Sequence, residues 1–456
     1  MNHWKMIISD FLEKQFGSSL FTYREVLNML LPIILDAFFI NAIGILTTAM
    51  ISTSSQESVA AVSLVNPIAI IIYAVISALA TGGTILTARY AGQGETEKIK
   101  KTAGQVVGIV VAASFFMSLL ILFSTKYIVQ ILFIGADPVI VSKAAKYLAG
   151  VSVSMVFLAA YLGAFSVFRG IGDTKTCLKL TVMVNLLHLF LSFLFLNILR
   201  MDIVGTALSL IIARAAGGTA GIYLLIRKRG KLKIPVRYFF KMEKSIVKNT
   251  FGIGAPYALE QIFFNGGSMI VQIFLVSLGT VYISVYAVAN SFLSIVYAAG
   301  MAVGTLSMTV VGQCLGAGKK DDAGKYGKSF CALGQFVIII SLAVFIPLMP
   351  VILKLYQAPD NTVVLIQQLI YVMVIPLVLF WPVSGIMPCV LRAGGDSMFC
   401  SLSSLIIMWI VRVLAGYILT VTMRMGIIGL WVTMPLEWLI RTVIYWRRFR
   451  YTGLRQ

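Results

Sequence analysis

The stretch PIILDAFFIN at residues 32–41 occurs a second time, in altered form, as PYALEQIFFN at residues 256–265. The two copies lie 224 residues apart in the chain. Each places an acid four residues after its proline, Asp36 in the first copy and Glu260 in the second. Both copies lie in long apolar runs, where burying a carboxylate costs free energy. Each acid is therefore expected to have a specific role.

The rest of the chain repeats at nearly the same spacing. The matched pairs include Asn66 with Asn290, Gly94 with Gly318, Arg200 with Arg424 and Gly205 with Gly429. Two loops match at a spacing of 223, with Arg169, Gly172 and Asp173 in the first and Arg392, Gly395 and Asp396 in the second. A duplicated apolar chain with matched acids is typical of transporters, which place their substrate path between two like halves.

The composition indicates a membrane protein. Of the 456 residues, 59% are hydrophobic and 12% are charged, against about 25% charged in soluble domains. The apolar residues form runs long enough to cross a bilayer, and such runs must be helical because lipid satisfies no backbone polar group. Twelve runs are predicted: 26–51, 58–88, 103–125, 139–168, 176–199, 204–226, 250–277, 282–312, 329–353, 362–391, 398–422 and 426–446.

The predicted fold is an all-α membrane protein with twelve transmembrane helices in two six-helix lobes related by an internal parallel repeat. Residues 25–226 form the first lobe, residues 227–249 a basic cytoplasmic linker and residues 250–450 the second lobe. Residues 1–24 are predicted to form an amphipathic segment on the membrane surface, because their apolar residues fall on one helical face: Trp4, Ile7, Ile8, Phe11 and Leu12.

The net charge of +20 is an orientation signal. Most of the 37 Lys and Arg fall in loops on the side of the N-terminus, so both termini are predicted to be cytoplasmic, with the chain in the cytoplasmic membrane. The basic loops would contact lipid headgroups. Nucleic-acid binding is not expected, since no reader motif is present. Nucleotide binding is not expected either, because no GxxxxGK[ST] phosphate loop occurs.

The five cysteines include no CxxC pair and fall near cytoplasmic span ends, which argues against disulfides or a metal site: Cys177, Cys314, Cys331, Cys389 and Cys400. The sequence contains no catalytic nucleophile, metal-ligand or paired-acid pattern, so an enzyme is not expected. No cofactor is expected, and the energy source is predicted to be an ion gradient. The chain is expected to act as a monomer.

Several motifs together resemble the multidrug and toxic compound extrusion (MATE) family. They are SSQESVAAVSLVNP at 54–67, ARYAGQGETEK at 88–98, FRGIGDTKT at 168–176, VVGQCLGAGKKDDA at 310–323 and VLRAGGDSM at 390–398. The resemblance covers nearly the whole chain and implies twelve helices in two lobes around a central cleft. It also implies export of organic cations and other amphiphilic compounds in exchange for protons or sodium ions.

Three acids lie inside the predicted spans: Asp36, Glu260 and Glu437. An acid at the centre of a membrane helix costs at least about 2.5 kcal/mol and marks a functional site by default. Asp36 and Glu260 lie near prolines, which free a backbone carbonyl beside the carboxylate. We therefore predict ion coupling at Glu260, with proton or sodium binding. For Asp36, ion coupling and a fixed structural pairing stay equal alternatives.

The chain departs from the family pattern in its first half. The acid that members often carry later in span 1 is replaced by Thr47, and an acid of span 5 is replaced by Leu189, beside His188. His188 could relay protons, although a packing role is the main alternative. Supporting polar positions are Asn41, Asn66, Asn185, Asn265 and Asn290, as oxygen ligands or as interhelical contacts.

Two arginines lie inside spans, Arg214 and Arg412. Arg412 needs a counter-charge, and the candidates are Glu437 and Glu260. Pairing with Glu437 would leave Glu260 free for ion coupling. The Arg and Asp of each repeated loop, Arg392 with Asp396 in the second, are predicted to pin a glycine turn.

Span 10 carries three prolines and is predicted to be a kinked gating helix. Aromatic and proline residues proposed for the substrate cleft and its gating are Trp381, Pro382, Tyr257, Phe264 and Tyr371. The function predicted is an ion-coupled antiporter that exports organic cations or amphiphilic drugs by alternating access between two lobes. One alternative is a flippase for lipid-linked saccharide precursors, and another is a channel or a membrane scaffold.

Overall fold

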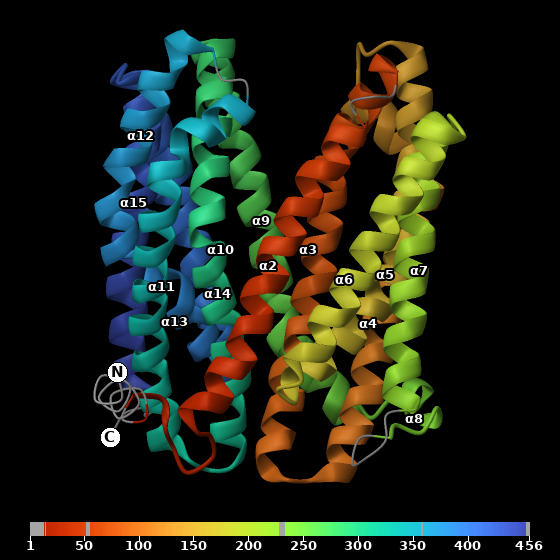
Figure 1. Ribbon diagram of the computed structural model, residues 1–456, viewed down its shortest axis with the longest axis vertical. Helices are drawn as coiled ribbons and strands as arrows, with labels where there is room; N and C mark the ends of the chain where they lie inside the picture. The colour runs from red at the N-terminus through yellow and green to blue at the C-terminus, as the bar shows by residue number, and fades with distance from the viewer. Residues whose placement is uncertain (1–12, 14, 52–54, 228–232, 357–358, 453–456) are drawn as a thin grey trace, which may run out of the picture. The chain divides into compact units, whose positions relative to one another are not determined.

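The computed structural model describes residues 13, 15–51, 55–227, 233–356 and 359–452, and these residues form helices and no strands (Figure 1). The helices are α2 (Tyr23–Ile51), α3 (Gln56–Gln93), α4 (Thr96–Leu132), α5 (Pro138–Gly170), α6 (Thr174–Ser192), η1 (Phe193–Ile198), α7 (Asp202–Arg227), α8 (Arg237–Phe240), α9 (Lys244–Leu278), α10 (Thr280–Gly316), α11 (Lys320–Leu355), α12 (Asp360–Leu379), α13 (Trp381–Gly394), α14 (Ser397–Ile407), η2 (Met408–Ala415), η3 (Ile418–Thr422) and α15 (Gly426–Tyr451).

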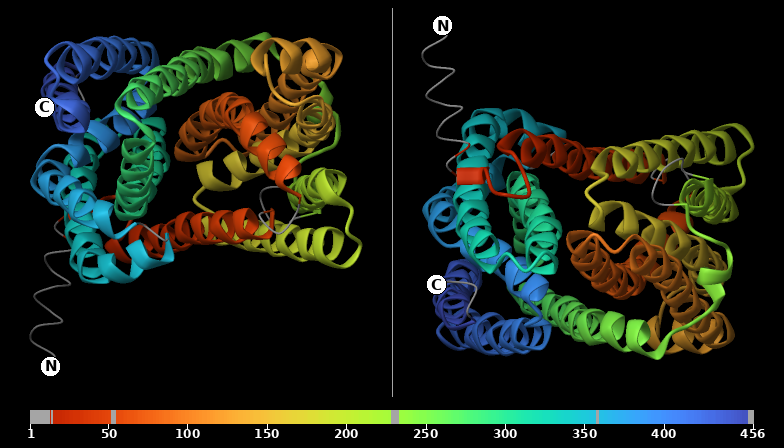
Figure 2. Two further views of the ribbon diagram at one scale, coloured as in Figure 1. Left: turned by 90° about the horizontal axis from the view of Figure 1, so that it is seen from above. Right: turned by 90° about the horizontal axis from the view of Figure 1, so that it is seen from below.

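The chain folds into two compact units. Unit 1 comprises Met1–Ala37 and Leu259–Gln456, and unit 2 comprises Phe38–Ala258. The helices α2 and α9 therefore each contribute to both units. The boundary between the units follows Ala37 in α2, five residues after Pro32, and Ala258 in α9, two residues after Pro256. Figure 2 shows the same helices from above and from below.

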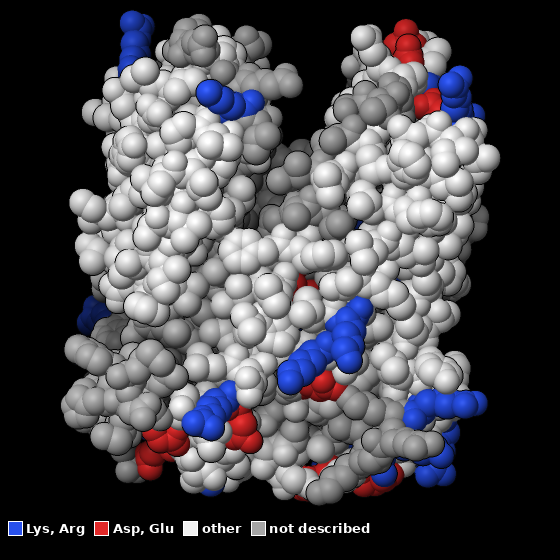
Figure 3. All heavy atoms as spheres, viewed as in Figure 1, with Lys and Arg blue, Asp and Glu red and all other residues white. Residues whose placement is uncertain are grey.

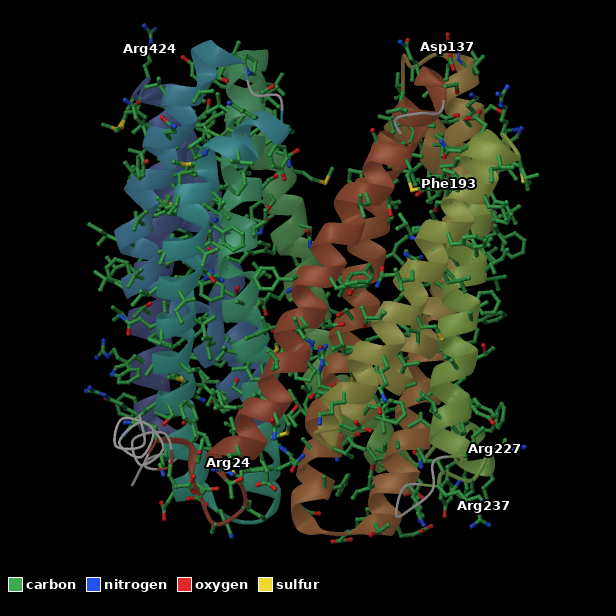
Figure 4. The ribbon with its side chains drawn as sticks, viewed as in Figure 1. Arg24, Asp137, Phe193, Arg227, Arg237 and Arg424 are labelled. Atoms are coloured by element: carbon green, nitrogen blue, oxygen red, sulfur yellow. The ribbon has the colours of Figure 1, made fainter. Side chains whose placement is uncertain are left out.

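The twelve predicted spans are present as helical segments, because α6 with η1, α12 with α13, and α14 with η2 and η3 each form one span. Among the described residues, 11 helices are long and apolar enough to cross a membrane. Figure 4 shows the two ends of each unit. In unit 2, Asp137 lies at the opposite end from Arg227 and Arg237, and in unit 1 Arg24 lies at the opposite end from Arg424. On the face drawn in Figure 3, charged side chains gather toward the ends of the helices.

The internal repeat extends to unusual backbone geometry. Arg200 and Arg424 both have positive φ, at 50° and 55°, although such angles are uncommon outside glycine. The π-helical segment before each of them also repeats, as η1 and η3. The backbone N–H of Met201 donates to the carbonyl of Phe195 at 2.8 Å, and that of Met425 donates to Leu419 at 3.0 Å. Each half thus closes its fifth span with the same turn.

The core of unit 2 is organised around α5, most of whose inner side chains are buried. The helix α7 approaches α5 closely because it carries glycines on the facing side. A Cβ added at Gly218 would lie 2.8 Å from the carbonyl oxygen of Phe157, and one at Gly221 would lie 2.8 Å from Cβ of Ala164. Small residues at such contacts give membrane helices their van der Waals packing.

The basic linker packs onto the first turns of α4. Tyr238 on α8 donates its hydroxyl hydrogen to Glu97, and the backbone N–H of Glu243 donates to Gln105 at 2.7 Å. Gly104 permits this contact, because a Cβ there would lie 2.7 Å from the backbone of Tyr238. The linker is therefore held to unit 2 by specific contacts.

The segment before α2 packs on the first turns of α11, within unit 1. The Tyr326 hydroxyl donates to the Phe16 carbonyl at 2.6 Å, and Lys325 donates to the Gly17 carbonyl at 2.6 Å. Phe16 is buried, with its ring centroid 6.0 Å from that of Phe330. Of the amphipathic segment predicted for residues 1–24, the apolar residues Trp4 to Leu12 lie outside the described part of the chain.

Candidate functional site

Glu260 lies on α9 in a closed polar contact inside unit 1. Glu260 is 7% exposed to solvent. Oε2 accepts a hydrogen bond from Nη2 of Arg392 at 2.6 Å and a second from the hydroxyl of Ser401 at 2.9 Å. Arg392 ends α13 and Ser401 lies on α14, so three helices converge on one carboxylate oxygen. A charge-assisted contact of this length is among the stronger hydrogen bonds in proteins.

This contact corrects two predictions. The first held that Glu260 stays free when Arg412 pairs with Glu437, whereas Arg392 occupies Glu260. The second held that Arg392 and Asp396 pin their turn by an ion pair. Asp396 instead accepts two hydrogen bonds from Arg448, at 2.9 and 3.0 Å. The turn itself is made by Gly395, whose φ of +104° suits glycine.

A second buried ion cluster lies around Glu437 on α15, which is 1% exposed. Nε of Arg412 lies 2.9 Å from one carboxylate oxygen, and Nη2 of Arg441 lies 2.7 Å from the other. Glu437 is one of the two partners that the sequence suggested for Arg412. Arg441 also donates to the Ser404 carbonyl at 3.2 Å. Two guanidinium groups share one carboxylate, so this cluster carries a net positive charge.

Phe264 lies beside both arginines of this cluster. The guanidinium carbons of Arg412 and Arg441 each lie 5.7 Å from the centre of its ring. This distance permits cation–π attraction. Phe264 follows Glu260 by one helical turn, so the two ion clusters contact successive turns of α9.

The predicted gating helix is broken at Phe380, between α12 and α13. The Phe380 carbonyl accepts from the Thr442 hydroxyl at 2.8 Å. Trp381, which follows the break, is 6% exposed and stacks on Tyr297 with ring centres 5.4 Å apart. Pro382 is buried as well, while Tyr371 on α12 is 53% exposed. Trp381 therefore packs as a core residue in this structure, and the roles in gating and cargo contact stay predictions.

The two asparagines predicted to support the site on α9 and α10, Asn265 and Asn290, are half-buried. The side-chain amide of Asn265 donates to the Gln261 carbonyl in its own helix at 2.7 Å. Asn290 on α10 is half-buried. Neither contacts Glu260 among the hydrogen bonds of the described residues. No group of three His, Cys, Asp or Glu side chains suited to a metal ion occurs in that part of the chain.

The predicted residues of the first half fall in different places. Asp36 is 6% exposed and belongs to unit 1, whereas Thr47 belongs to unit 2 and is half-buried. Asn66 on α3 is exposed. Tyr257 is half-buried in unit 2. The side chain of Asn41 lies outside what the structure describes.

Two further predicted residues lie on α6, in unit 2. The Asn185 amide donates to the Thr181 carbonyl of its own helix at 2.9 Å. His188 is half-buried, and its Nε2 is enclosed without a hydrogen-bond partner among the described residues. These contacts leave the predicted supporting roles of both residues untested.

Three site residues were not predicted from the sequence: Arg392 and Ser401 as partners of Glu260, and Arg441 as a partner of Glu437. A signal existed for Arg441, because Glu437 and Arg441 are four residues apart, which places them on one helical face. No local pattern links Glu260 to residues 132 and 141 positions away.

Comparison with known proteins decides the family. The MatE family model matches residues 32–194 and again residues 256–418, with the two matches offset by the spacing of the internal repeat. The chain belongs to the MatE family. It is therefore a MATE transporter, and its fold and family are those of transporters rather than of enzymes.

Relatives of this MATE transporter align over most of its length. It is 27% identical to the uncharacterized transporter YisQ of Bacillus subtilis over 92% of each chain. It is 21% identical to the probable multidrug resistance protein NorM of Thermotoga maritima, over 92% of this chain and 90% of that protein.

Solved structures share the fold. An outward-facing multidrug resistance MATE family transporter of the MOP superfamily matches with a TM-score of 0.85 at 17% identity, over 94% of this chain and 96% of that one. A MOP superfamily transporter from Pyrococcus furiosus, described as having a binding pocket of reverse polarity, matches with a TM-score of 0.84 at 18% identity, over 95% and 96%. This MATE transporter thus has the twelve-helix fold expected from its sequence.

Proposed function

We propose that this MATE transporter is an ion-coupled antiporter that exports organic cations or amphiphilic drugs by alternating access. The family and the multidrug resistance relatives support efflux as its general activity. The observation that carries the ion coupling is the buried contact of Glu260 with Arg392 and Ser401.

The chemistry of this contact suits a coupling step. With Glu260 ionised, the pair with Arg392 is neutral in total. A proton on Glu260, or a sodium ion beside it, removes the partner of Arg392 and leaves one added positive charge. In a low-dielectric interior that charge acts over several ångströms and raises the cost of holding a cationic cargo nearby. Ion loading would therefore favour cargo release, and ion release would favour cargo binding.

Sodium and protons make different demands on this site. Sodium prefers several oxygen ligands, and Glu260 with the hydroxyl of Ser401 offers three oxygen atoms. A proton needs only the carboxylate. Both ions remain part of the proposal, and the coupling experiment distinguishes them.

The test uses proteoliposomes and rhodamine B ethyl ester, a permanent organic cation. Efflux is followed with a pH gradient and a sodium gradient imposed separately, on the wild type and on Glu260→Gln. We expect one gradient to drive efflux in the wild type and neither to drive it in the variant. Glu95→Gln is the matched control, because Glu95 pairs with Lys98 in an exposed contact. Efflux that proceeds in the wild type without either gradient would overturn antiport.

A further inference from the structure

Arg214 is a cation in the middle of a membrane-spanning helix with no acid beside it. It lies twelve residues after the start of α7 and thirteen before its end. Nη1 donates to the Ser154 hydroxyl at 2.6 Å and lies 3.7 Å from the sulfur of Met155. Both partners are uncharged. Among the described residues, no carboxylate forms an ion pair with Arg214.

The buried arginines of unit 1, unlike Arg214, form ion pairs with carboxylates. Arg392 pairs with Glu260, and Arg412 and Arg441 pair with Glu437. A cation at the centre of a membrane helix costs at least about 2.5 kcal/mol and almost always faces a partner or a water-filled cavity. The free-energy cost of burying Arg214 is not offset by an ion pair, as it is for the other three arginines.

Unit 2 could not supply a carboxylate at that depth. The acids of Phe38–Ala258 all lie at or beyond helix ends: Glu57, Glu95, Glu97, Asp137, Asp173, Asp202 and Glu243. Its mid-span ionisable groups are Arg214 and His188. The middle of this unit is therefore positive or neutral, and never negative.

The surroundings of Arg214 are those of a built polar site. Ser154 is 0% exposed and bonds the guanidinium, while Arg214 itself is only half-buried. His188, Tyr147 and Tyr73 lie within electrostatic range of the guanidinium. These three side chains come from α6, α5 and α3, so four helices meet here. Each of them can donate a hydrogen bond.

We propose that Arg214, held in place by the hydroxyl of Ser154, recognises together with His188 one oxyanion group, a carboxylate or a phosphate, on an otherwise amphiphilic small molecule. The inference rests on the proposed function, because it narrows the cargo of the same transporter to zwitterionic amphiphiles, which carry an oxyanion as well as a cationic group. A guanidinium with free N–H groups suits an oxyanion because it can present two parallel donors. The bound anion would supply the compensation that the fold omits.

The depth of Arg214 favours a soluble cargo over a lipid. At 1.5 Å per residue, it lies about 18–20 Å from either end of α7. The hydrocarbon core is about 30 Å thick, so this position is near its centre. The phosphate of a resting lipid lies at the surface instead.

The first measurement is equilibrium binding to the purified full-length protein in phosphatidylcholine nanodiscs. The probes are rhodamine B and its ethyl ester, which differ in whether the carboxylate is free. We expect Arg214→Gln to weaken rhodamine B binding about tenfold or more, which corresponds to about 1.4 kcal/mol, and to leave ester binding within about twofold. Arg214→Lys, which keeps the charge, should retain most of the affinity. Equal losses for both probes, or no loss for either, would overturn the proposal.

Two further measurements distinguish a cargo site from a structural cation and from a lipid-phosphate site. If Arg214 were a structural cation, its replacement would lower the melting temperature of the protein. We expect Arg214→Gln to leave the melting temperature unchanged or to raise it, because the substitution removes a charge that has no counter-charge. Displacement of rhodamine B by phosphatidic acid in the nanodisc would assign the site to lipid phosphate and overturn the cargo assignment. If the ester is not exported by the wild type under either gradient, the proposed function fails, and the binding comparison still decides the oxyanion site.

Discussion

Nη2 of Arg392 lies 2.6 Å from Oε2 of Glu260, and both side chains are almost fully removed from solvent. Arg392 belongs to a loop motif that occurs in both repeats, and Glu260 belongs to the proline–acid motif that also occurs in both. The contact therefore connects two repeated elements of the sequence within one unit. It holds α9 to the last turn of α13.

Removing Arg392 alone should destabilise the protein strongly. Arg392→Met leaves a buried carboxylate without its cation, and breaking such pairs costs about 3–5 kcal/mol. The double variant Glu260→Gln, Arg392→Met removes both charges and should recover most of that loss. The melting temperature of each variant in detergent measures the effect. Equal losses in the single and double variants would mean that the ion pair is not the cause.

Glu437→Gln should be more damaging than Glu260→Gln. The substitution leaves Arg412 and Arg441 close to each other, beside Phe264, without a carboxylate. We expect a loss of about 3–5 kcal/mol, read from the melting temperature and the yield of folded protein. Adding Arg412→Met to the variant should restore part of it, because one of the two unpaired cations is then absent. The prediction is wrong if Glu437→Gln melts like the wild type.

Gly218→Val should weaken the contact between α7 and α5. The new side chain would enter the space beside the carbonyl of Phe157, where even a Cβ would lie at 2.8 Å. Overpacking of this kind costs about 1–3 kcal/mol. Gly266→Ala on α9 is the control, because nothing lies within 4 Å of a Cβ there, and it should be neutral or slightly stabilising. Thermal unfolding of both variants decides between them.

Tyr326→Phe should loosen the segment that precedes α2. It removes the hydroxyl that bonds the carbonyl of Phe16 at 2.6 Å and the side chain of Ser18 at 3.1 Å. At about 0.5–1.5 kcal/mol for each bond, amide hydrogen exchange of residues 15–21 should become faster. Tyr417→Phe is the control, because its hydroxyl makes no hydrogen bond among the described residues. Unchanged exchange in Tyr326→Phe would show that the ring contacts alone hold the segment.

Much of the fold could be predicted from the sequence, for reasons that are local. The span lengths follow from apolar runs that must be helical in lipid. The repeat at 224 residues aligns Arg200 with Arg424, and both residues have positive φ angles in the structure. The sequence also named Glu437 as one of two candidate partners for Arg412, because few charges lie within the spans and each buried charge needs a partner.

Other parts of the site depend on which helices meet. Asp396 was expected to pair with Arg392, four residues away, whereas the contacts found are of Arg392 with Glu260 and of Asp396 with Arg448. The residues of a glycine turn are close in sequence, but the direction of a long arginine side chain is decided by the charges it can reach after packing. The lone position of Arg214 is similar, since the sequence shows an arginine in a span and cannot show that no acid lies beside it.

The sequence by itself determined the twelve helices, their two-fold repetition and the membership of a transporter family, because hydrophobicity, glycine turns and repeated motifs act over short stretches of chain. Only the tertiary structure decided which charges are paired. It placed Arg392 on Glu260, gave Glu437 two arginines and left Arg214 with Ser154 and Met155. The physical reason is that electrostatic energy depends on distance through space, and the packing of helices far apart in the chain sets those distances.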